Sequence, residues 1–254
     1  MSYTKPIPRR TKGSGPKIIV FSGAGLDAPS GIRTFRDSNG LWNEYKIEDV
    51  CTESTWKRNF EVVHSFYNER RADLANTQPN HAHYVLKELE EEYKEDFIHV
   101  TMNVSDLIEK ARGSALHVHG DLTKMECTAC GHKWTIGYKR FDIEKHRCPN
   151  CDSLKGVKPF IVFFGGIAPM YTYMSRAFEY ASHPDSVFLI IGTQGNVVPV
   201  EMMLNYTPCK KFLLNMEQSV DINVNKLGNC TAYYESVEDS IDKVREYIDK
   251  NFKR

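Results

Sequence analysis

The sequence predicts a doubly wound α/β fold: a Rossmann-like parallel sheet, covered by helices, that carries a small inserted zinc-binding module. Three observations predict it. Short apolar runs recur along the chain, amphipathic patterns lie between them, and two C-x-x-C pairs interrupt this alternation. Strands that alternate with helices favour a parallel sheet. A chain of 254 residues can bury the core of one large domain with an insert.

The predicted strands are five runs that are apolar on both faces, as is typical of a sheet covered on both sides. They read KIIVF, FIHVT, FIVFF, VFLII and KFLLN and cover residues 17–21, 97–101, 160–164, 187–191 and 211–215. We expect them to belong to the parallel sheet.

Two helices are predicted from apolar residues at helical spacing. The first covers the segment HAHYVLKELEEEYK, with its apolar positions at Ala82, Val85, Leu86 and Leu89. The last helix begins at Ser236, which can form a capping box with Asp239. Its apolar stripe consists of Val237, Ile241, Val244 and Ile248.

Composition and charge exclude several classes of protein. The basic residues 1–15 contain no apolar core, so we expect a disordered tail rather than a signal peptide. No apolar run approaches the roughly 18 residues of a membrane span. The 33 basic residues balance 33 acidic ones, which argues against a dedicated nucleic-acid binder. We therefore expect neither a membrane nor a nucleic-acid partner. We also expect a cytoplasmic protein that is a monomer.

Four of the seven cysteines have the spacing of a metal site. Cys127 and Cys130 form one C-x-x-C pair, Cys148 and Cys151 form another, and seventeen residues separate the pairs. This arrangement suits a tetrahedral Zn²⁺ ion held by four thiolates, in a reducing compartment. Four thiolates leave no open position, so the zinc is expected to be structural. The alternative is four free cysteines in a loop.

A glycine-rich turn, GAGLDAPSGIRTFR, follows the first predicted strand. Glycines there let backbone N–H groups approach an anion such as a phosphate. Gly23 and Gly25 fit the dinucleotide pattern G-x-G-x-x-G, but the next glycine is Gly31 and not residue 28. A tight turn without a ligand is the alternative.

Polar residues follow several predicted strands, where ligands bind in open α/β sheets. They occur in TMNVSD (101–106), in HVHG (117–120), after VFLII and after KFLL. We expect Asn103, His119, Thr193 and Asn215 to converge on the ligand held by Gly23 and Gly25. Histidine is suited to proton transfer near neutral pH, although a structural role is the alternative for His119.

Together these motifs resemble the sirtuin family of NAD-dependent protein deacylases, from about residue 17 to the C-terminus. The resemblance rests on GAGLDAPSGIRTFR, PNHAH, TMNVSD, HVHG, the paired C-x-x-C, KPFIVFFG, GTQGNVVP and LNME. It implies that NAD is consumed as a co-substrate, that His119 is the general base, and that the acyl-lysine pairs along Val162, Phe164 and Gly165. The implied NAD contacts are Gly23, Ala24, Gly25, Phe35, Arg36, Met102, Asn103, Ser105, Gly192, Thr193, Gln194, Asn215, Met216, Glu217 and Val237.

The segment FYNERR places Tyr67 and Arg70 on one face of a predicted helix. It resembles the Tyr-x-x-Arg pair that lines the acyl pocket of class III, bacterial-type deacylases. A phenol and a guanidinium can receive the distal carboxylate of a succinyl or malonyl group. The alternative is a core tyrosine with a solvated arginine.

The expected organisation is a tail over residues 1–15, an NAD-binding domain over 16–120 and 157–254, and a zinc module over 121–156. A helical segment at about 40–78 contributes the acyl pocket. The reaction implied by the resemblance gives free lysine, nicotinamide and 2′-O-acyl-ADP-ribose. NAD hydrolysis, ADP-ribosyl transfer, or a catalytically weak sensor of NAD or ADP-ribose are the alternatives.

Several positions depart from the sirtuin motifs. Met102, Ser105 and Ile108 stand where the family has glutamine, aspartate and histidine. Asp27 and Gln194 replace serines, and Gly166 replaces a glutamate. The family's aspartate receives the nicotinamide carboxamide, so Ser105→Asp is expected to speed nicotinamide release. Asp27 is expected to cap the following helix and to repel a pyrophosphate, and Asp106 is not assumed to replace the missing aspartate.

Overall fold

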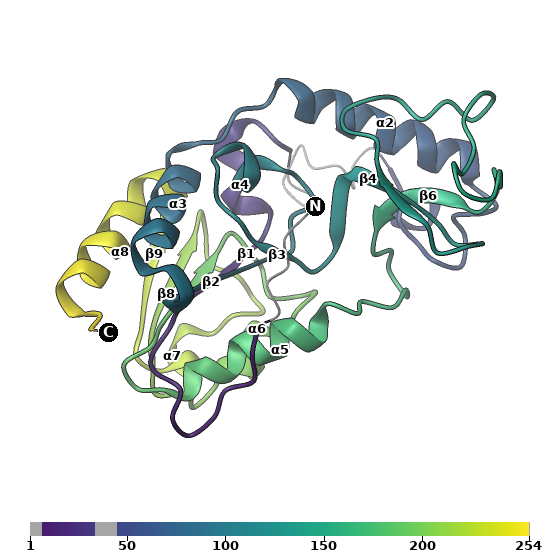
Figure 1. Ribbon diagram of the computed structural model, residues 1–254. Helices are drawn as coiled ribbons and strands as arrows, with labels where there is room; N and C mark the ends of the chain where they lie inside the picture. Colours follow the sequence, from purple (N-terminus) through teal and green to yellow (C-terminus); the bar gives the residue numbers. More distant parts are fainter. Residues whose placement is uncertain (1–6, 34–44, 254) are drawn as a thin grey trace.

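The structure, a computed structural model, describes residues 7–33 and 45–253. It consists of a six-stranded parallel sheet with helices on both faces and a three-stranded antiparallel sheet beside it (Figure 1). Within the described ranges, no helix combines the length and the hydrophobicity that a membrane span needs.

The parallel sheet has the strand order β3-β2-β1-β7-β8-β9. Its strands are β1 (Ile18–Ser22), β2 (Phe97–Thr101), β3 (Leu116–His117), β7 (Val187–Ile191), β8 (Lys210–Asn215) and β9 (Cys230–Tyr234). The chain proceeds outward from β1 in one direction to β2 and in the other to β7. The two crossover connections therefore diverge at the carboxyl end of β1, where open α/β sheets bind their ligands.

Helices cover both faces of this sheet. Helices α3 (His81–Tyr93) and α8 (Val237–Asn251) pack on one face, and α5 (Tyr171–Glu179), α6 (Val200–Leu204) and α7 (Val224–Leu227) pack on the other (Figure 1). The predicted apolar stripes of α3 and α8 are confirmed, since all eight side chains are buried. The predicted capping box of α8 is half correct: Ser236 accepts a bond from the Glu238 N–H, but Asp239 makes no return bond. A full box forms on α3, between Asn80 and His83.

The second sheet joins β4 (Gly120–Cys127), β5 (Lys133–Thr135) and β6 (Val157–Ile161) in the order β5-β4-β6. Helix α2 (Phe60–Asn76), preceded by α1 (Ile47–Val50), packs against this sheet (Figure 1). Asn68 of α2 bonds both ways with the backbone of Phe141, at 3.0 and 2.8 Å. We call this sheet, the loops between its strands and α2 the small domain; the sheet extends beyond the expected module at 121–156, because β6 covers Val157–Ile161.

Short helical turns complete the chain. They are η1 (Ala24–Leu26), η2 (Ala28–Ser30), η4 (Lys94–Asp96), α4 (Leu107–Lys110) and η5 (Tyr180–Ser182).

The predicted strand at 160–164 is wrong in its bounds and in its sheet. The strand is β6, and it pairs antiparallel with β4. Its apolar character has another cause: Ile161 and Phe163 face the core beneath α2, whereas Val157 packs around the cysteine pairs.

The expected disordered tail at 1–15 is wrong for residues 7–10. Ile7 is 8% exposed and packs in the core beside α5. Its carbonyl accepts a bond from Arg176 Nη1 at 3.2 Å, and the Arg10 N–H donates to Glu179 at 3.3 Å. One apolar side chain and these backbone bonds hold the segment against α5. Residues 1–6 lie outside the described part.

Candidate functional site

The glycine-rich turn lies at the carboxyl end of β1, against the loop that follows β7. The Gly23 N–H donates to the Ile191 carbonyl at 2.8 Å, and the Gly25 N–H donates to the Gly192 carbonyl at 3.0 Å. A Cβ atom added to Gly25 would lie 2.4 Å from the Cα of Gly192, which itself has a φ of 61°. A side chain at Gly25 or Gly192 would separate the two loops, so the close approach of their backbones explains why both residues are glycine. Gly31, at a φ of 87°, ends η2 and is not part of this crossing.

Polar side chains from the predicted cluster fix the loops around Gly23. The Asn103 amide donates to the Gly23 carbonyl at 2.9 Å. Asn215 accepts from the Thr193 N–H at 3.1 Å and donates to the Thr193 carbonyl at 2.9 Å. Gly23 also faces Met102 and Thr193, since its added Cβ would lie 3.0 and 3.3 Å from their side chains. The loops after β1, β2, β7 and β8 thus meet at the topological switch point, the carboxyl end of β1 between the two halves of the sheet.

His119 follows β3 and lies beside the same loops. Its Nδ1 is 3.2 Å from the Met102 carbonyl, which can only accept, so Nδ1 carries the proton. Nε2 is therefore the free lone pair, and it accepts a hydrogen bond from the Tyr171 hydroxyl at 2.8 Å. Burial lowers the pKa of His119, against the opposing effect of the Met102 bond. The imidazole is thus neutral near pH 7 and has the form of a general base.

His117, two residues earlier, is bonded differently. Nδ1 donates to the Asn103 carbonyl at 2.8 Å, and Nε2 donates to Glu109 at 3.0 Å. Burial alone would lower the pKa of His117, but the hydrogen bond and charge of Glu109 raise it above its ordinary value. With both nitrogens donating, this imidazole is charged and structural.

The Asp27 side chain belongs to the glycine-rich turn and is buried. Its carboxylate accepts a bond from the Ser105 hydroxyl at 2.6 Å and lies 3.2 Å from Nε2 of His83. His83 Nδ1 accepts from the Asn80 N–H, so Nε2 carries the proton and donates to Asp27. The expectation that Asp27 caps the following helix is wrong, because the side chain turns inward and makes no cap bond.

Asp106, next to Ser105, contacts residues other than the glycine-rich turn. Its carboxylate accepts a bond from Tyr138 of the small domain and lies 3.8 Å from the Lys110 ammonium. Burial raises the pKa of Asp106, partly offset by the Tyr138 bond. Ile108, where the sirtuin motif has histidine, packs in the core beside α3.

The remaining predicted NAD contacts differ in their setting. Gln194, Met216 and Glu217 are exposed at the ends of β7 and β8, where the Gln194 carbonyl accepts from Ser219 at 2.6 Å. The Val237 side chain is 4% exposed and packs in the core under α8, so only its backbone is available to a ligand. Phe35 and Arg36 lie outside the described residues.

Tyr67 and Arg70 lie one turn apart on α2. Tyr67 is 5% exposed, and its hydroxyl donates to the Cys51 thiol at 3.3 Å. Arg70 contacts Asp73 through Nη2 at 3.1 Å and stacks over the Phe66 ring at 5.2 Å. In the described part of the chain, Nε and Nη1 of Arg70 are buried without a hydrogen-bond partner. Two buried guanidinium nitrogens without an acceptor are costly unless a ligand accepts their N–H groups.

The expected acyl-lysine segment runs from the small domain back toward the sheet. The Val162 N–H donates to the carbonyl of His119 at 2.8 Å, so this segment is tied to the candidate base. Both backbone groups of Phe164 are already bonded to the segment after α1: its N–H to Cys51 at 2.9 Å and its carbonyl to Glu53 at 3.0 Å. Gly165 follows and is exposed. Both backbone groups of Phe164 are therefore engaged within the chain, and the residue is 39% exposed.

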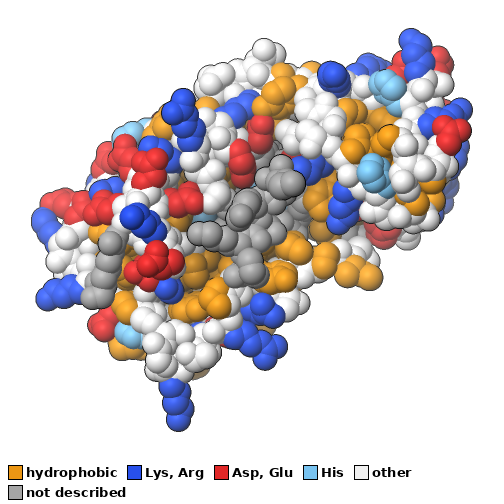
Figure 2. All heavy atoms as spheres, in the orientation of Figure 1, with side chains coloured by type: hydrophobic (Ala, Val, Ile, Leu, Met, Phe, Trp, Pro, Cys, Tyr) orange, Lys and Arg blue, Asp and Glu red, His pale blue; other side chains and the backbone are white. Residues whose placement is uncertain are grey.

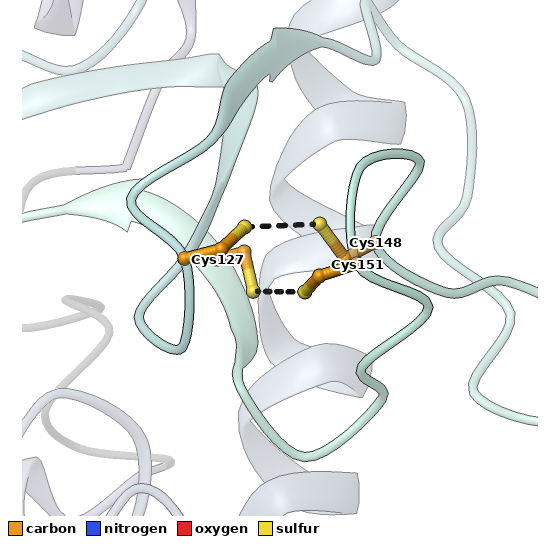
Figure 3. Close-up of side chains that lie close together, drawn as sticks. Cys127, Cys148 and Cys151 are labelled. Atoms are coloured by element: carbon orange, nitrogen blue, oxygen red, sulfur yellow. Dashed lines mark hydrogen bonds between the residues drawn. The ribbon is translucent and has the colours of Figure 1, made fainter.

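The four cysteines of the insert converge (Figure 3). The Cys127 and Cys151 sulfurs lie 3.7 Å apart, as do those of Cys130 and Cys148, and all four lie within 4.8 Å of one another. Tetrahedral Zn–S bonds of about 2.3 Å place sulfurs about 3.8 Å apart, whereas a disulfide needs about 2 Å. The Asn150 amide donates to the Cys130 sulfur at 3.5 Å, as outer partners of metal ligands do. The cluster is thus positioned to bind a structural zinc, rather than being four unrelated free cysteines.

The fold and the site together define a Rossmann-like protein with an inserted four-cysteine module. At the ends of its strands, a glycine-rich turn, two asparagines and a histidine lie close together. The chain belongs to the Sir2 family, since the sequence model of that family matches residues 23–199.

Curated relatives cover nearly the whole chain. It is 43% identical over 242 residues to an NAD-dependent protein deacylase of Helicobacter hepaticus, covering 89% of this chain and 91% of the relative. It is 38% identical over 228 residues to one of Campylobacter jejuni, with 89% and 93% covered.

Solved structures agree with this fold. A Sir2 homologue–NAD complex matches with a TM-score of 0.77 and 26% identity, covering 95% of this chain and 92% of that one. A mutant Sir2 homologue in complex with ADP-ribose matches with a TM-score of 0.79 and 26% identity, covering 94% and 93%.

Proposed function

We propose that this chain is an NAD-dependent protein-lysine deacylase that prefers short acidic acyl groups, of the desuccinylase or demalonylase type. The observation that carries the proposal is the neutral His119, whose basic Nε2 lies beside loops that fit a dinucleotide. The names of the relatives support the deacylase activity. The unpaired N–H groups of Arg70 support the acyl preference.

The residues at the strand ends fit NAD. The turn at Gly23 to Gly25 would approach the pyrophosphate, and Asn103 would lie near the nicotinamide ribose. Thr193 and Asn215 would lie near the adenosine half, where the ends of β7 and β8 meet. Bound NAD supplies an activated ribose carbon, a nicotinamide leaving group and the hydroxyls of that ribose.

His119 is the residue that moves a proton in this scheme. The Met102 carbonyl fixes the Nδ1 proton, so only Nε2 can accept one from a ribose hydroxyl. The Tyr171 hydroxyl is bonded to Nε2, so a ribose hydroxyl would have to replace it there.

The acyl group would lie against α2. Its distal carboxylate would accept bonds from Nε and Nη1 of Arg70, which relieves two buried unpaired donors. The Tyr67 hydroxyl now donates to a thiol, a weak acceptor, and can turn to a carboxylate instead. Acetyl-lysine offers neither contact.

Four thiolates that converge as a metal site, rather than as disulfides, are consistent with a reducing compartment such as the cytoplasm.

The test is a mass-spectrometric assay of acetyl-, malonyl- and succinyl-lysine peptides, with and without NAD, alongside nicotinamide release. We expect NAD-dependent loss of the acyl group, fastest for succinyl or malonyl, and formation of 2′-O-acyl-ADP-ribose. Nicotinamide release without any peptide would instead indicate NAD hydrolysis or ADP-ribosyl transfer. NAD binding without nicotinamide release would indicate a sensor, and either outcome overturns the proposal.

A further inference from the structure

Asp27 and Ser105 join two loops of the site through one buried hydrogen bond. Asp27 lies between η1 and η2 after β1, and Ser105 lies in the segment after β2. The Ser105 hydroxyl donates to Asp27 Oδ2 at 2.6 Å, and the two residues are 7% and 3% exposed. A hydroxyl bonded to a carboxylate at this length is a charge-assisted bond.

The carboxylate retains acceptor capacity toward a ligand. Two carboxylate oxygens offer about four lone-pair sites, and only the bonds from Ser105 and His83 occupy them among the described residues. No lysine or arginine in the described part of the chain forms an ion pair with Asp27.

The segment that carries Ser105 also contacts the glycine-rich turn and the candidate base. Ser105 is two residues from Asn103, whose amide holds the Gly23 carbonyl. Met102, one residue earlier, holds His119 through its own carbonyl. Because Asn103 is proposed to lie near the nicotinamide ribose, the Asp27 carboxylate bonded to this segment would lie toward the same end of NAD.

We infer that Asp27 is the acceptor for the carboxamide N–H groups of nicotinamide, and that Asp27 and Ser105 are a reciprocal exchange of one carboxylate–hydroxyl pair. This inference rests on the proposed function. Asp27 stands where the sirtuin motif has serine, and Ser105 stands where it has aspartate. Because the two side chains touch, these departures are not independent losses. The site keeps one carboxylate and one hydroxyl, but each comes from the loop that carries the other group in the sirtuin motif.

The exchange reverses the expectation for Ser105→Asp. That variant places two carboxylates in contact in a buried site, where one must bind a proton or move away. Asp27→Ser has the opposite defect: two hydroxyls remain, no carboxylate accepts the carboxamide, and the His83 N–H loses its partner. Only the double variant Asp27→Ser/Ser105→Asp again holds one carboxylate and one hydroxyl.

The test compares the dissociation constants of NAD and of ADP-ribose, which lacks nicotinamide, by calorimetry for the two single variants and the double. Loss of a hydrogen bond to a charged group predicts that each single variant binds NAD about 10- to 100-fold more weakly. ADP-ribose binding should change by less than about threefold, since it makes no carboxamide contact. The double variant should recover at least tenfold over the weaker single variant, as coupled neighbours do.

Two controls separate this effect from damage to the fold. Ser186→Ala removes another buried serine hydroxyl, which holds the Lys17 N–H at 2.9 Å at the opposite end of the sheet. It should leave the NAD to ADP-ribose ratio unchanged. Asp27→Asn keeps the shape of the side chain and serves if Asp27→Ser fails to fold by circular dichroism; it should weaken NAD selectively.

Losses that simply add in the double variant would overturn the inference, as would ADP-ribose binding that falls in step with NAD. These measurements need no acyl peptide. A wild-type protein that binds NAD but removes no acyl group would therefore refute the deacylase proposal while leaving this comparison decisive.

Discussion

Replacement of Arg70 by methionine tests the acyl preference. Methionine keeps an unbranched apolar chain against the Phe66 ring but removes the guanidinium. In the structure only Nη2 is paired, with the largely exposed Asp73, and Nε and Nη1 are buried without partners among the described residues. An acyl carboxylate bonded to these two groups is expected to contribute about 2–3 kcal/mol, which is about 30- to 150-fold in kcat/KM.

The assay measures kcat/KM for one peptide carrying either succinyl- or acetyl-lysine. Arg70→Met should lower the succinyl value about 30- to 150-fold and the acetyl value less than about threefold, because acetyl-lysine never contacts the guanidinium. Asp73→Asn is the matched control, since it breaks the Nη2 ion pair but keeps the guanidinium. It should preserve the succinyl preference. An unchanged succinyl-to-acetyl ratio in Arg70→Met would refute the assignment of Arg70 to the acyl pocket.

Three further outcomes are expected. Metal analysis should find about one zinc per chain, and Cys148→Ser should lower both zinc content and melting temperature; wild-type protein without zinc would contradict the site. His119→Ala should abolish deacylation yet keep NAD binding in calorimetry, and retained activity would mean a different base. Because burial lowers the pKa of His119, wild-type kcat/KM should stay constant down to the ordinary histidine pKa of about 6.5 and should decrease only at lower pH. Burial lowers the pKa of His64 to about 4, so it is neutral when folded and binds a proton on unfolding below about pH 6.5. Unfolding free energy in urea should therefore decrease between pH 6.5 and 4, by at most about 3 kcal/mol from this group, and His64→Gln should flatten that slope.

The central strands could be predicted from the sequence because helices bury both of their faces. Strands β1, β2, β7 and β8 each carry a nearly unbroken apolar run. Strand β9 was missed because it is a half-exposed edge strand, although its sequence CTAYY is rich in β-forming residues. Strand β3 has only two residues. The run at 160–164 was identified as apolar, but periodicity cannot show which sheet a strand joins.

The site was predicted less completely than the fold. The cysteine spacing was sufficient to select four residues that converge, whereas the role of His119 was expected from the family resemblance and stays a prediction. Tyr171, the hydroxyl partner of His119, carries no local signal, because 52 residues separate the two. The Asp27–Ser105 contact spans 78 residues and looks like two unrelated departures in the sequence. Tertiary pairs of this kind follow from the topology of the sheet and not from any window of sequence.

The seating of α2 on the cysteine-bearing insert links two parts of the protein thermodynamically. Asn68 holds the backbone of Phe141 from both sides, and Arg71, from the same helix, donates to the Lys139 carbonyl at 3.2 Å. Residues 139 and 141 lie in the loop between Cys130 and Cys148, which a bound zinc would close. On α2, Asn68 and Arg71 directly follow Tyr67 and Arg70. Free energy released on metal binding is therefore shared with the helix, as linkage requires. If Tyr67 and Arg70 receive the acyl group as proposed, removal of the metal should also weaken the discrimination between acyl groups.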